Sequence, residues 1–261
     1  MGVYNCKNFN LLYKSVDSII HQTFSDWEFI ICNDGSTNET YDELKKIREL
    51  DSRIRIISYD ENRGLSFALN VCMKEAEGKF IARQDDDDIS KPERLLKQIE
   101  FLEKHPQYDI VGTNAVIFDN SGIWGEYITP EKPMKDDFLW NSPFIHPSVM
   151  IKVNSLKKVD CYRVARETRR CEDYDLFMRM YAMGYKGYNL QEKLYCYRMV
   201  NDSKQKYRPM KYRIDEMIVR FKGYRKLKIL KKGLIYIFKP MLLGLMPQCL
   251  LYVIKKKQFE I

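Results

Sequence analysis

Hydrophobic positions alternate between helical spacing and short continuous runs over the first 118 residues. Leu12, Val16 and Ile19 lie on one face of a predicted helix, and the apolar run at 28–32 (EFIIC) predicts a buried strand. The alternation continues and predicts helices over 39–50, 65–76 and from Pro92 onwards, and strands over 54–58, 80–83 and 110–118. Strands that alternate with helices are typical of an α/β fold with a mostly parallel, Rossmann-like sheet flanked by helices.

The alternation loosens after Asn120. Four prolines interrupt residues 130–147, and beyond them the pattern predicts a strand at 149–152 and a helix that carries Leu176, Met180 and Met183. In an open parallel sheet, ligands bind at the carboxyl ends of the strands. We therefore expect the chemistry directly after residues 32, 58 and 83.

Composition excludes several classes of protein. The 261 residues are 45% hydrophobic and 31% charged, which is ordinary for a globular protein and unlike a disordered, collagenous or coiled-coil chain. The seven cysteines are widely spaced with no C-x-x-C pair, so reduced thiols in a cytoplasmic protein are expected. Residues 1–5 show no basic or apolar leader, so secretion is not expected.

Charge is divided unevenly along the chain. Residues 204–261 contain 16 Lys and Arg against 3 Asp and Glu, a local +13, and residues 1–203 therefore sum to −5 of the net +8. This contrast predicts a body at 1–203 and a basic tail at 204–261 with an anionic partner. Because the tail also contains the apolar run 233–254, we expect an anionic membrane surface as its partner rather than nucleic acid.

Three arrangements of the run 233–254 stay open. It is long enough to span a bilayer, but Lys239, Pro240 and Pro247 interrupt it, and basic residues flank it on both sides. A helix that lies in the membrane interface satisfies both flanks, and we favour this arrangement. The alternatives are a helix packed on the body or on a second copy, which leaves an oligomer open, and true insertion into the bilayer.

Four consecutive carboxylates, Asp85–Asp88, follow the predicted strand at 80–83. They repel one another unless a cation compensates their charge, and oxygen ligands of this kind suit Mg²⁺ or Mn²⁺. The alternative is an exposed acidic run in which Asp88 or Ser90 caps the next helix.

Two further acidic signals are weak when taken alone. Turns favour Asp34-Gly35-Ser36, and the helix dipole favours Glu172-Asp173 at a helix start. The combination is more specific. In this order and spacing, four segments resemble the inverting family 2 glycosyltransferases with the GT-A fold, in particular bacterial members that build capsule, exopolysaccharide or O-antigen units: SIIHQTFSDWEFIICNDGS at 18–36, ARQDDDDISKPERL at 82–95, HPSVM at 146–150 and EDYDL at 172–176.

The resemblance covers roughly residues 3–200 and implies a nucleotide-sugar donor. Val3, Tyr4 and Asp34 would then hold the nucleotide base, and Asn62 and Arg63 would lie near the diphosphate. UDP is the carrier that the family favours, with dTDP and GDP left open.

The family's D-x-D element maps onto Asp85 and Asp87. Asp87 would bind the Mn²⁺ or Mg²⁺ that bridges the diphosphate. Asp85 would lie near the ribose and would be a second ligand of the same cation. Asp86 would support these two carboxylates. A divalent cation of this kind stabilises the charge that develops on a leaving phosphate.

The E-D element is the part of the family pattern that concerns the sugar acceptor. It maps onto Glu172 and Asp173, and Asp173 is the expected general base, because an inverting displacement needs one base to take the acceptor's hydroxyl proton. His146 is a candidate for the acceptor or phosphate region, with a structural role as the alternative.

The resemblance thus implies a metal-dependent enzyme that moves one sugar to a lipid-linked saccharide, attached peripherally to the inner face of the plasma membrane. The Q-x-x-R-W element of processive synthases is absent, which favours one sugar per encounter. Family members usually begin with a longer apolar strand than Met1–Asn5. Either the true start lies upstream, which we favour, or the sheet makes do with a short first strand and this copy is weakened. Two rivals stay open: an inactive relative that binds a nucleotide sugar or a partner at the membrane, and a nucleotidyltransferase, although no glycine-rich phosphate loop is present.

Overall fold

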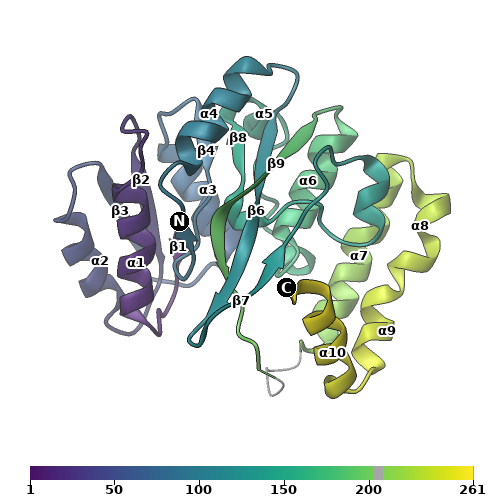
Figure 1. Ribbon diagram of the computed structural model, residues 1–261. Coiled ribbons are helices and arrows are strands. Elements are labelled where there is room, and N and C mark those ends of the chain that lie inside the picture. Colours follow the sequence, from purple (N-terminus) through teal and green to yellow (C-terminus); the bar gives the residue numbers. More distant parts are fainter. Residues whose placement is uncertain (203–207, 261) are drawn as a thin grey trace.

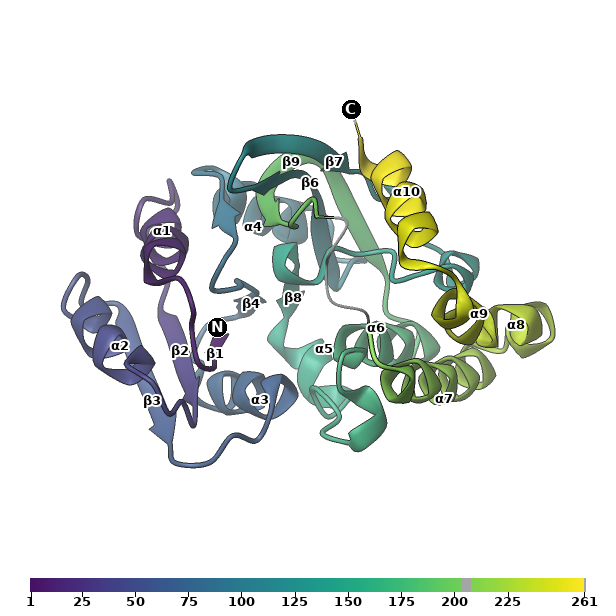
Figure 2. The same ribbon diagram turned by 90° about the horizontal axis from the view of Figure 1, so that it is seen from below.

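The computed structural model describes residues 1–202 and 208–260, and it has two sheets with helices on both faces (Figure 1). The first sheet is parallel, with the strand order β1-β2-β3, and is formed by β1 (Gly2–Val3), β2 (Phe29–Asp34) and β3 (Ile54–Tyr59). Three helices accompany it: α1 (Phe9–Ile20), α2 (Thr40–Arg48) and α3 (Leu65–Glu75). Figure 2 shows α1 and α2 on one side of this sheet and α3 on the other.

The continuous apolar run of β2 follows from this layering. Phe29 and Ile31 pack among the core side chains of α1 and α2, whereas Ile30 and Cys32 pack against Ala68 of α3 and its neighbours. Successive strand residues point to opposite faces, so a strand covered on both faces is apolar throughout.

The second sheet is mixed, and its strand order is β4-β8-β6-β9-β5, with β7 paired to β6. In the described part of the chain, β6 with β9 is the only parallel ladder of this sheet. Its strands are β4 (Phe80–Ala82), β5 (Ile89–Ser90), β6 (Ile110–Asp119), β7 (Gly122–Tyr127), β8 (Met150–Lys152) and β9 (Gly187–Arg198). The elements around it are α4 (Arg94–Lys104), α5 (Val153–Lys158), α6 (Glu172–Ala182) and the short 3₁₀ helices η1 (Lys135–Leu139), η2 (His146–Ser148) and η3 (Arg166–Thr168).

The first strand has only two residues. β1 pairs with β2, and the Met1 carbonyl accepts a hydrogen bond from the Cys32 N–H at 2.9 Å. Within residues 1–202 and 208–260 no ladder joins β1 to β4, so the sheet is divided at this point.

Four helices form the predicted tail: α7 (Met210–Leu227), α8 (Leu230–Ile237), α9 (Lys239–Leu245) and α10 (Gln248–Phe259). Val219 and Tyr224 of α7 are fully buried and share one core with Phe177 of α6. α8 packs on α7 so closely that a Cβ at Gly233 would lie 2.4 Å from the Tyr224 ring. The first part of the predicted tail is therefore packed on the body. The boundary at 203/204 was drawn from charge composition and stays a prediction.

α7 also holds the irregular segment that contains η1. Arg220 is 1% exposed and donates to the carbonyl oxygens of Leu139 and Trp140 at 3.0 and 3.1 Å. The Tyr224 hydroxyl donates to the Leu139 carbonyl at 3.0 Å. These bonds go to the backbone of the segment and not to its side chains.

Two local expectations were wrong. The helix expected from Pro92 begins at Arg94 with Glu93 as its N-cap, because residues 89–90 pair with β9 as a strand. Ser90 is thus part of β5, and Asp88 accepts a hydrogen bond from the Arg198 N–H at 2.6 Å, so neither residue caps the helix.

Candidate active site

Asp34 ends β2 and is only 3% exposed. Its Oδ1 accepts hydrogen bonds from the Tyr59 hydroxyl at 2.6 Å and the Arg63 N–H at 2.8 Å. Its Oδ2 accepts from the Asn62 side chain at 2.7 Å and the Gly64 N–H at 2.9 Å. The carboxylate therefore holds the whole segment between β3 and α3.

This arrangement brings together three of the predicted donor residues. Asn62 and Arg63 are positioned by Asp34, and the Arg63 guanidinium lies 3.5 Å from the centre of the Phe67 ring. Because hydrogen-bond donors of the chain occupy both carboxylate oxygens of Asp34, this carboxylate holds the segment around Asn62 in place in this structure. The contacts of the three residues with a nucleotide stay predictions.

Val3 and Tyr4 lie at the end of β1, next to the Asp34 turn. The Val3 side chain is buried in the core of the first sheet, so only its backbone can face a ligand, whereas Tyr4 is half-exposed. Asn5 follows with a φ of 45°, and its N–H donates to Ser36 Oγ at 2.9 Å. The segment is thus joined to the turn after β2.

Asp85–Asp88 form a turn that follows β4 after Arg83 and Gln84, and two arginines partly compensate their charge. The buried Arg83 forms an ion pair with Asp85. The Arg198 Nη1 lies 3.5 Å from the Asp87 Oδ2, and the Asp87 side chain is 46% exposed. Two guanidinium groups therefore face four carboxylates, so the turn keeps an excess of negative charge.

The pKa values of the acidic turn reflect this excess. Burial and the charges of Asp87 and Asp85 raise the pKa of Asp86 to about 7. Partial burial and Asp85 also raise the pKa of Asp87. Burial raises the pKa of Asp88 well above its usual range, and its Oδ2 is buried without a hydrogen-bond partner. A cation at the turn would stabilise the ionised forms.

A buried polar network fixes the backbone of the turn. Arg94 is fully buried, which lowers its pKa to about 10. Its guanidinium donates to four oxygens, at distances of 2.6–3.1 Å: the Arg83 carbonyl, Ser90 Oγ, Gln84 Oε1 and Gln98 Oε1. Gln84 in turn donates to the Asp88 carbonyl at 3.0 Å. Breaking such a network would leave several buried groups unsatisfied, so it defines one conformation of the turn.

The chemistry of this donor set fits a divalent cation bound jointly by protein and substrate. In the described part of the chain, no group of three or more His, Cys, Asp or Glu side chains could hold a metal by itself. Mg²⁺ is often held by one or two carboxylates plus substrate phosphates. Asp87 is the more accessible carboxylate, and Asp85 already has Arg83 as a partner. Both remain predicted ligands.

Glu172 and Asp173 begin α6, as the sequence indicates. Burial and the Glu172 charge raise the pKa of Asp173 to about 7. Burial raises the pKa of Glu172, whereas the positive charge of Arg83 acts in the opposite direction. Arg83 therefore acts electrostatically on both acidic elements.

His146 lies in η2 and has a partner within the chain. Its Nε2 is 2.6 Å from the Tyr162 hydroxyl. Burial and the nearby Arg83 lower the pKa of His146 well below its usual value. A neutral imidazole bound to Tyr162 supports the structural alternative, and a phosphate or acceptor contact stays a prediction.

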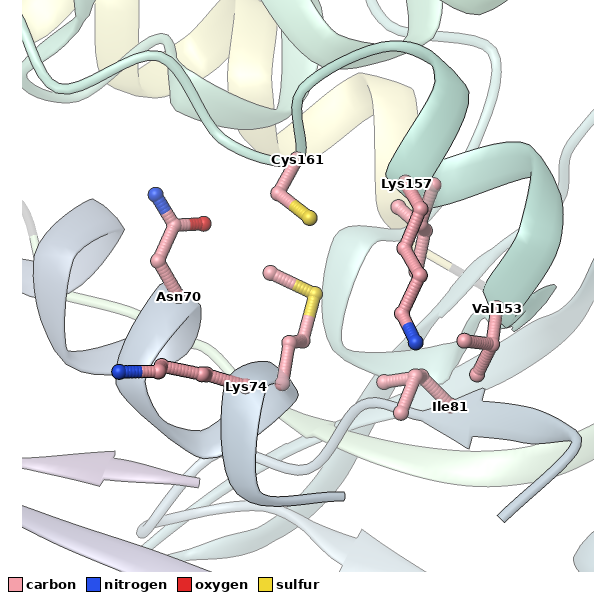
Figure 3. A pocket seen from close by; sticks show the side chains of 8 residues that line it. Asn70, Lys74, Ile81, Val153, Lys157 and Cys161 are labelled. Atoms are coloured by element: carbon pink, nitrogen blue, oxygen red, sulfur yellow. The ribbon is translucent and has the colours of Figure 1, made fainter. Parts of the chain in front are cut away.

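An apolar cavity of about 220 Å³ lies away from these residues (Figure 3). None of the predicted site residues contributes to its wall. It lies between α3, β4 and α5, and its lining residues are Asn70, Met73, Lys74, Ile81, Val153, Leu156, Lys157 and Cys161.

The sequence did not indicate three residues of the site. Arg83 lies two positions before Asp85, and a cation this close in sequence to four carboxylates was the signal available. Tyr195, whose hydroxyl accepts from the Asp85 N–H at 3.4 Å, and Arg198 come from β9, more than 100 positions away along the chain. No sequence pattern connects them to the turn.

Comparison with known proteins shows several similarities. A family model described as glycosyl transferase family 2 matches residues 1–163. EpsE of Bacillus subtilis, named as a glycosyltransferase, is 39% identical over 259 residues, 99% of this chain and 92% of its own length. The UDP-Glc:alpha-D-GlcNAc-diphosphoundecaprenol beta-1,3-glucosyltransferase WfgD of Escherichia coli is 32% identical over 141 residues, 54% of each chain.

Solved structures share the fold at lower sequence identity. TarS 1-349 of S. aureus in complex with UDP-GlcNAc has a TM-score of 0.71 and 18% identity, over 98% of this chain and 79% of that chain. The chain spans 42% of a longer TarS chain. The mannosyltransferase PcManGT of Pyrobaculum calidifontis in complex with GDP-Man and Mn²⁺ has a TM-score of 0.63 and 15% identity, over 98% and 72%.

Proposed function

The chain belongs to glycosyl transferase family 2, and from this premise we propose that it transfers one sugar, with inversion, from a UDP-sugar to a lipid-linked saccharide at a membrane surface during cell-surface polysaccharide synthesis. The observation that carries the proposal is the position of Arg83. This buried guanidinium pairs with Asp85 after β4 and acts electrostatically on Glu172 at the start of α6. Donor and acceptor chemistry would meet at this point.

The relatives support the choice of donor and acceptor classes. WfgD is named for a UDP-sugar donor and an acceptor carried on diphosphoundecaprenol, and TarS was solved with UDP-GlcNAc. In this chain, the backbone of Val3, with Tyr4 and the Asn62–Arg63 segment held by Asp34, would contact the nucleotide. Asp85 and Asp87 would hold Mn²⁺ or Mg²⁺, which supplies electrostatic stabilisation of the leaving diphosphate when bound.

The reaction would be a single displacement. Asp173 takes the proton of an acceptor hydroxyl, the hydroxyl oxygen bonds to the anomeric carbon from the face opposite the leaving group, and the bond to the diphosphate oxygen breaks. Its electron pair leaves with UDP. A pKa of about 7 suits Asp173 for this role, because a general base works best when its pKa lies near the working pH.

The outer surface of α8 and α9 supports membrane attachment. Ile235 and Leu245 are 72% and 70% exposed, and Phe238 and Leu242, at helical spacing between them, are also exposed. The opposite side, with Gly233, Ile237 and Pro240, is buried against the body. We name the four exposed residues 235, 238, 242 and 245 the apolar face. Helices packed on a body normally expose polar side chains, so this face suits a lipid surface.

Aromatic and basic residues border the apolar face. The half-exposed Trp140 lies 3.6 Å from the Lys239 Nζ, measured to the ring centre, and Lys231 and Lys232 lie at the start of α8. Trp and Lys are typical of the membrane interface, and basic residues favour anionic lipid. No helix within 1–202 or 208–260 is long and apolar enough to cross a bilayer. Attachment in the interface is the arrangement we propose.

A two-step experiment tests the proposed function. First, UDP-, dTDP- and GDP-sugars are compared by thermal shift with and without Mn²⁺, because a ligand that binds the folded state raises its apparent stability. Second, a panel of sugar-diphosphate-alkyl acceptors is assayed for transfer by mass spectrometry, with Asp173→Asn as the matched control. We expect Mn²⁺-dependent binding of a UDP-sugar in both proteins and transfer by the unmodified chain alone. Binding without transfer to any acceptor would favour the inactive relative, and no binding would refute the proposal.

A further inference from the structure

A segment rich in arginine, residues 163–170, comes shortly before the predicted base. It contains four arginines against one glutamate. Arg163 and Arg166 have carboxylate partners within the protein. Arg169 and Arg170 are exposed, and within the described ranges no Asp or Glu forms an ion pair with either of them. We name Arg169 and Arg170 the arginine pair.

The chain itself keeps the arginine pair close to the start of α6. Arg170 and Asp173 are three positions apart, and because an extended chain spans at most about 3.6 Å per residue, their Cα atoms lie within about 11 Å of each other. Glu172 and Asp173 are half-buried, so a ligand can reach both side chains. An acceptor whose hydroxyl contacts Asp173 carries its diphosphate about one sugar ring away, which brings the diphosphate near the arginine pair.

The backbone of the arginine pair is held in one conformation. Arg170 has a φ of 71°, in the left-handed region that residues other than glycine seldom adopt. Its carbonyl oxygen accepts a hydrogen bond from the Arg208 Nη2 at 3.3 Å, and the Cys171 N–H donates to the Thr168 carbonyl oxygen at 2.9 Å. An uncommon backbone conformation that neighbouring contacts maintain is typical of a functional position.

A short series of hydrogen bonds joins the arginine pair to the helix that carries part of the apolar face. The Arg208 that donates to Arg170 is itself held by Arg213 of α7. The Arg213 Nε donates to the Arg208 carbonyl oxygen at 3.4 Å, and its Nη1 donates to the Pro240 carbonyl oxygen in α9 at 3.1 Å. A Cβ at Gly244 would lie 2.6 Å from the Arg213 Cδ, so α9 packs directly on the start of α7. Along this series of contacts, the arginine pair lies between the apolar face and the predicted base.

We infer that the arginine pair binds the diphosphate of a lipid-linked acceptor. The inference rests on the proposed function and names the residues that recognise this part of the acceptor. The apolar face would contact lipid, the arginine pair would contact the diphosphate, and Asp173 would contact the sugar hydroxyl, which is the order of these groups in the acceptor. Guanidinium groups suit this role, because they bind phosphate oxygens through two parallel hydrogen bonds.

The charges at the start of α6 require a cation of this kind. Glu172 and Asp173 are acidic and repel a diphosphate that approaches them. Arg163 is not available to offset this repulsion, because Glu167 and Asp175 hold its guanidinium at 2.7 and 3.0 Å. The arginine pair has no such partner in the part of the chain that the structure describes, so its charge is available to the ligand.

Binding of a short, water-soluble alkyl diphosphate tests the inference directly. Calorimetry is carried out with saturating UDP and Mn²⁺, so that the donor position is occupied. In the double variant Arg169→Ala/Arg170→Ala, we expect the Kd to rise about 10-fold or more, because hydrogen bonds to a charged group are lost. Arg169→Lys/Arg170→Lys keeps the charge without the paired hydrogen bonds and should give an intermediate Kd.

A matched control removes two cations elsewhere. Lys45→Ala/Arg48→Ala changes two exposed residues of α2, which lies at the far end of the molecule from α6 and α7 in both views (Figures 1 and 2). This variant should bind the alkyl diphosphate like the unmodified chain. No binding to the unmodified chain, or an unchanged Kd in Arg169→Ala/Arg170→Ala, would overturn the inference.

Transfer kinetics separate the diphosphate of the acceptor from that of the donor. In Arg169→Ala/Arg170→Ala, the KM for a sugar-diphosphate-alkyl acceptor should rise about 10-fold, whereas the KM for UDP-sugar should stay within about twofold. An equal rise in both KM values would place the arginine pair on the donor and overturn the inference. If the unmodified chain binds the alkyl diphosphate but transfers sugar to no acceptor, the proposed function fails, and the calorimetry still decides whether the arginine pair binds a diphosphate.

Discussion

Replacement of Asp34 by Ala should destabilise the protein strongly, even though the residue is the last one of its strand. One buried carboxylate accepts four hydrogen bonds, two of them from the N–H groups of Arg63 and Gly64. A hydrogen bond to a charged group contributes about 1.5–3 kcal/mol, but these four are not additive, since water can reach the exposed Asn62. We therefore expect a loss of about 3 kcal/mol in the free energy of unfolding.

Urea unfolding measures this loss. With an m-value of about 3 kcal/mol/M for a chain of this size, the midpoint should fall by about 1 M. Tyr59→Phe is the matched control, because it removes one of the four donors, and it should cost about 1.5 kcal/mol, the lower end of the range for one hydrogen bond to a charged group. Asp34→Asn should behave like Asp34→Ala, because its amide places a donor where the chain already supplies donors.

The reasoning would be refuted by an Asp34→Ala protein whose unfolding midpoint matches that of the unmodified chain. A protein that keeps its stability and loses only UDP binding would indicate that Asp34 acts on the nucleotide directly. A loss of both would fit the structure, because Asp34 positions Asn62 and Arg63.

Four other predictions concern single features. Asp87→Ala should abolish the Mn²⁺-dependent part of the UDP thermal shift, because a ligand is lost. Transfer should rise with pH through about 7, where burial and Glu172 hold the pKa of Asp173, and Asp173→Asn should reduce transfer by at least about 100-fold. Glu in place of both Ile235 and Leu242 should reduce co-sedimentation with anionic liposomes. Gly233→Ala should lower the free energy of unfolding by about 1–3 kcal/mol, since its Cβ would lie 2.4 Å from the Tyr224 ring.

Asp173 also makes stability depend on pH. Its pKa is higher in the folded than in the unfolded protein, so ionisation costs stability as the pH rises from about 4 through about 7. Asp173→Asn should therefore unfold at a higher temperature than the unmodified chain at pH 8, and the difference should disappear at pH 4. An equal difference at both pH values would contradict the raised pKa.

Matched controls exist for the other substitutions. Ile123, exposed in the β6–β7 hairpin, can be changed to Glu as the liposome control, because it lies outside the apolar face. Deletion of 225–261 is unsuitable, because Leu227 and Ile237 belong to the core. Co-sedimentation that survives both substitutions would count against the apolar face, and Mn²⁺ dependence that survives Asp87→Ala would count against that ligand.

The sequence allowed most of the first sheet and the fold class to be predicted. β2 and β3 were expected at 28–32 and 54–58 and lie at Phe29–Asp34 and Ile54–Tyr59. β2 is buried on both faces, so its apolar run is continuous and local, whereas β3 lies at the edge of the sheet and is apolar at Ile54, Ile56 and Ile57. The family and the GT-A-like fold were confirmed by the comparisons.

β9 was not predicted, although it has 12 residues. Its register against β6 shifts at Thr113 and Asn114, which interrupts the alternation of apolar and polar positions that identifies a strand. The same strand brings Tyr195 and Arg198 to the acidic turn. Such contacts depend on pairing between distant segments, which a local pattern does not encode.

Arg220 and Tyr224 bind the carbonyl oxygens of residues 138–140 and none of the side chains there. Every amino acid supplies the same carbonyl group, so this attachment is indifferent to the sequence of the segment. The exposed positions of 135–140 can therefore be exchanged between relatives without redesign of α7, whereas Phe138 is fully buried in the core and must stay apolar. For protein engineering, these exposed positions are a natural site for a loop library, because the anchor of the segment is kept while their side chains vary.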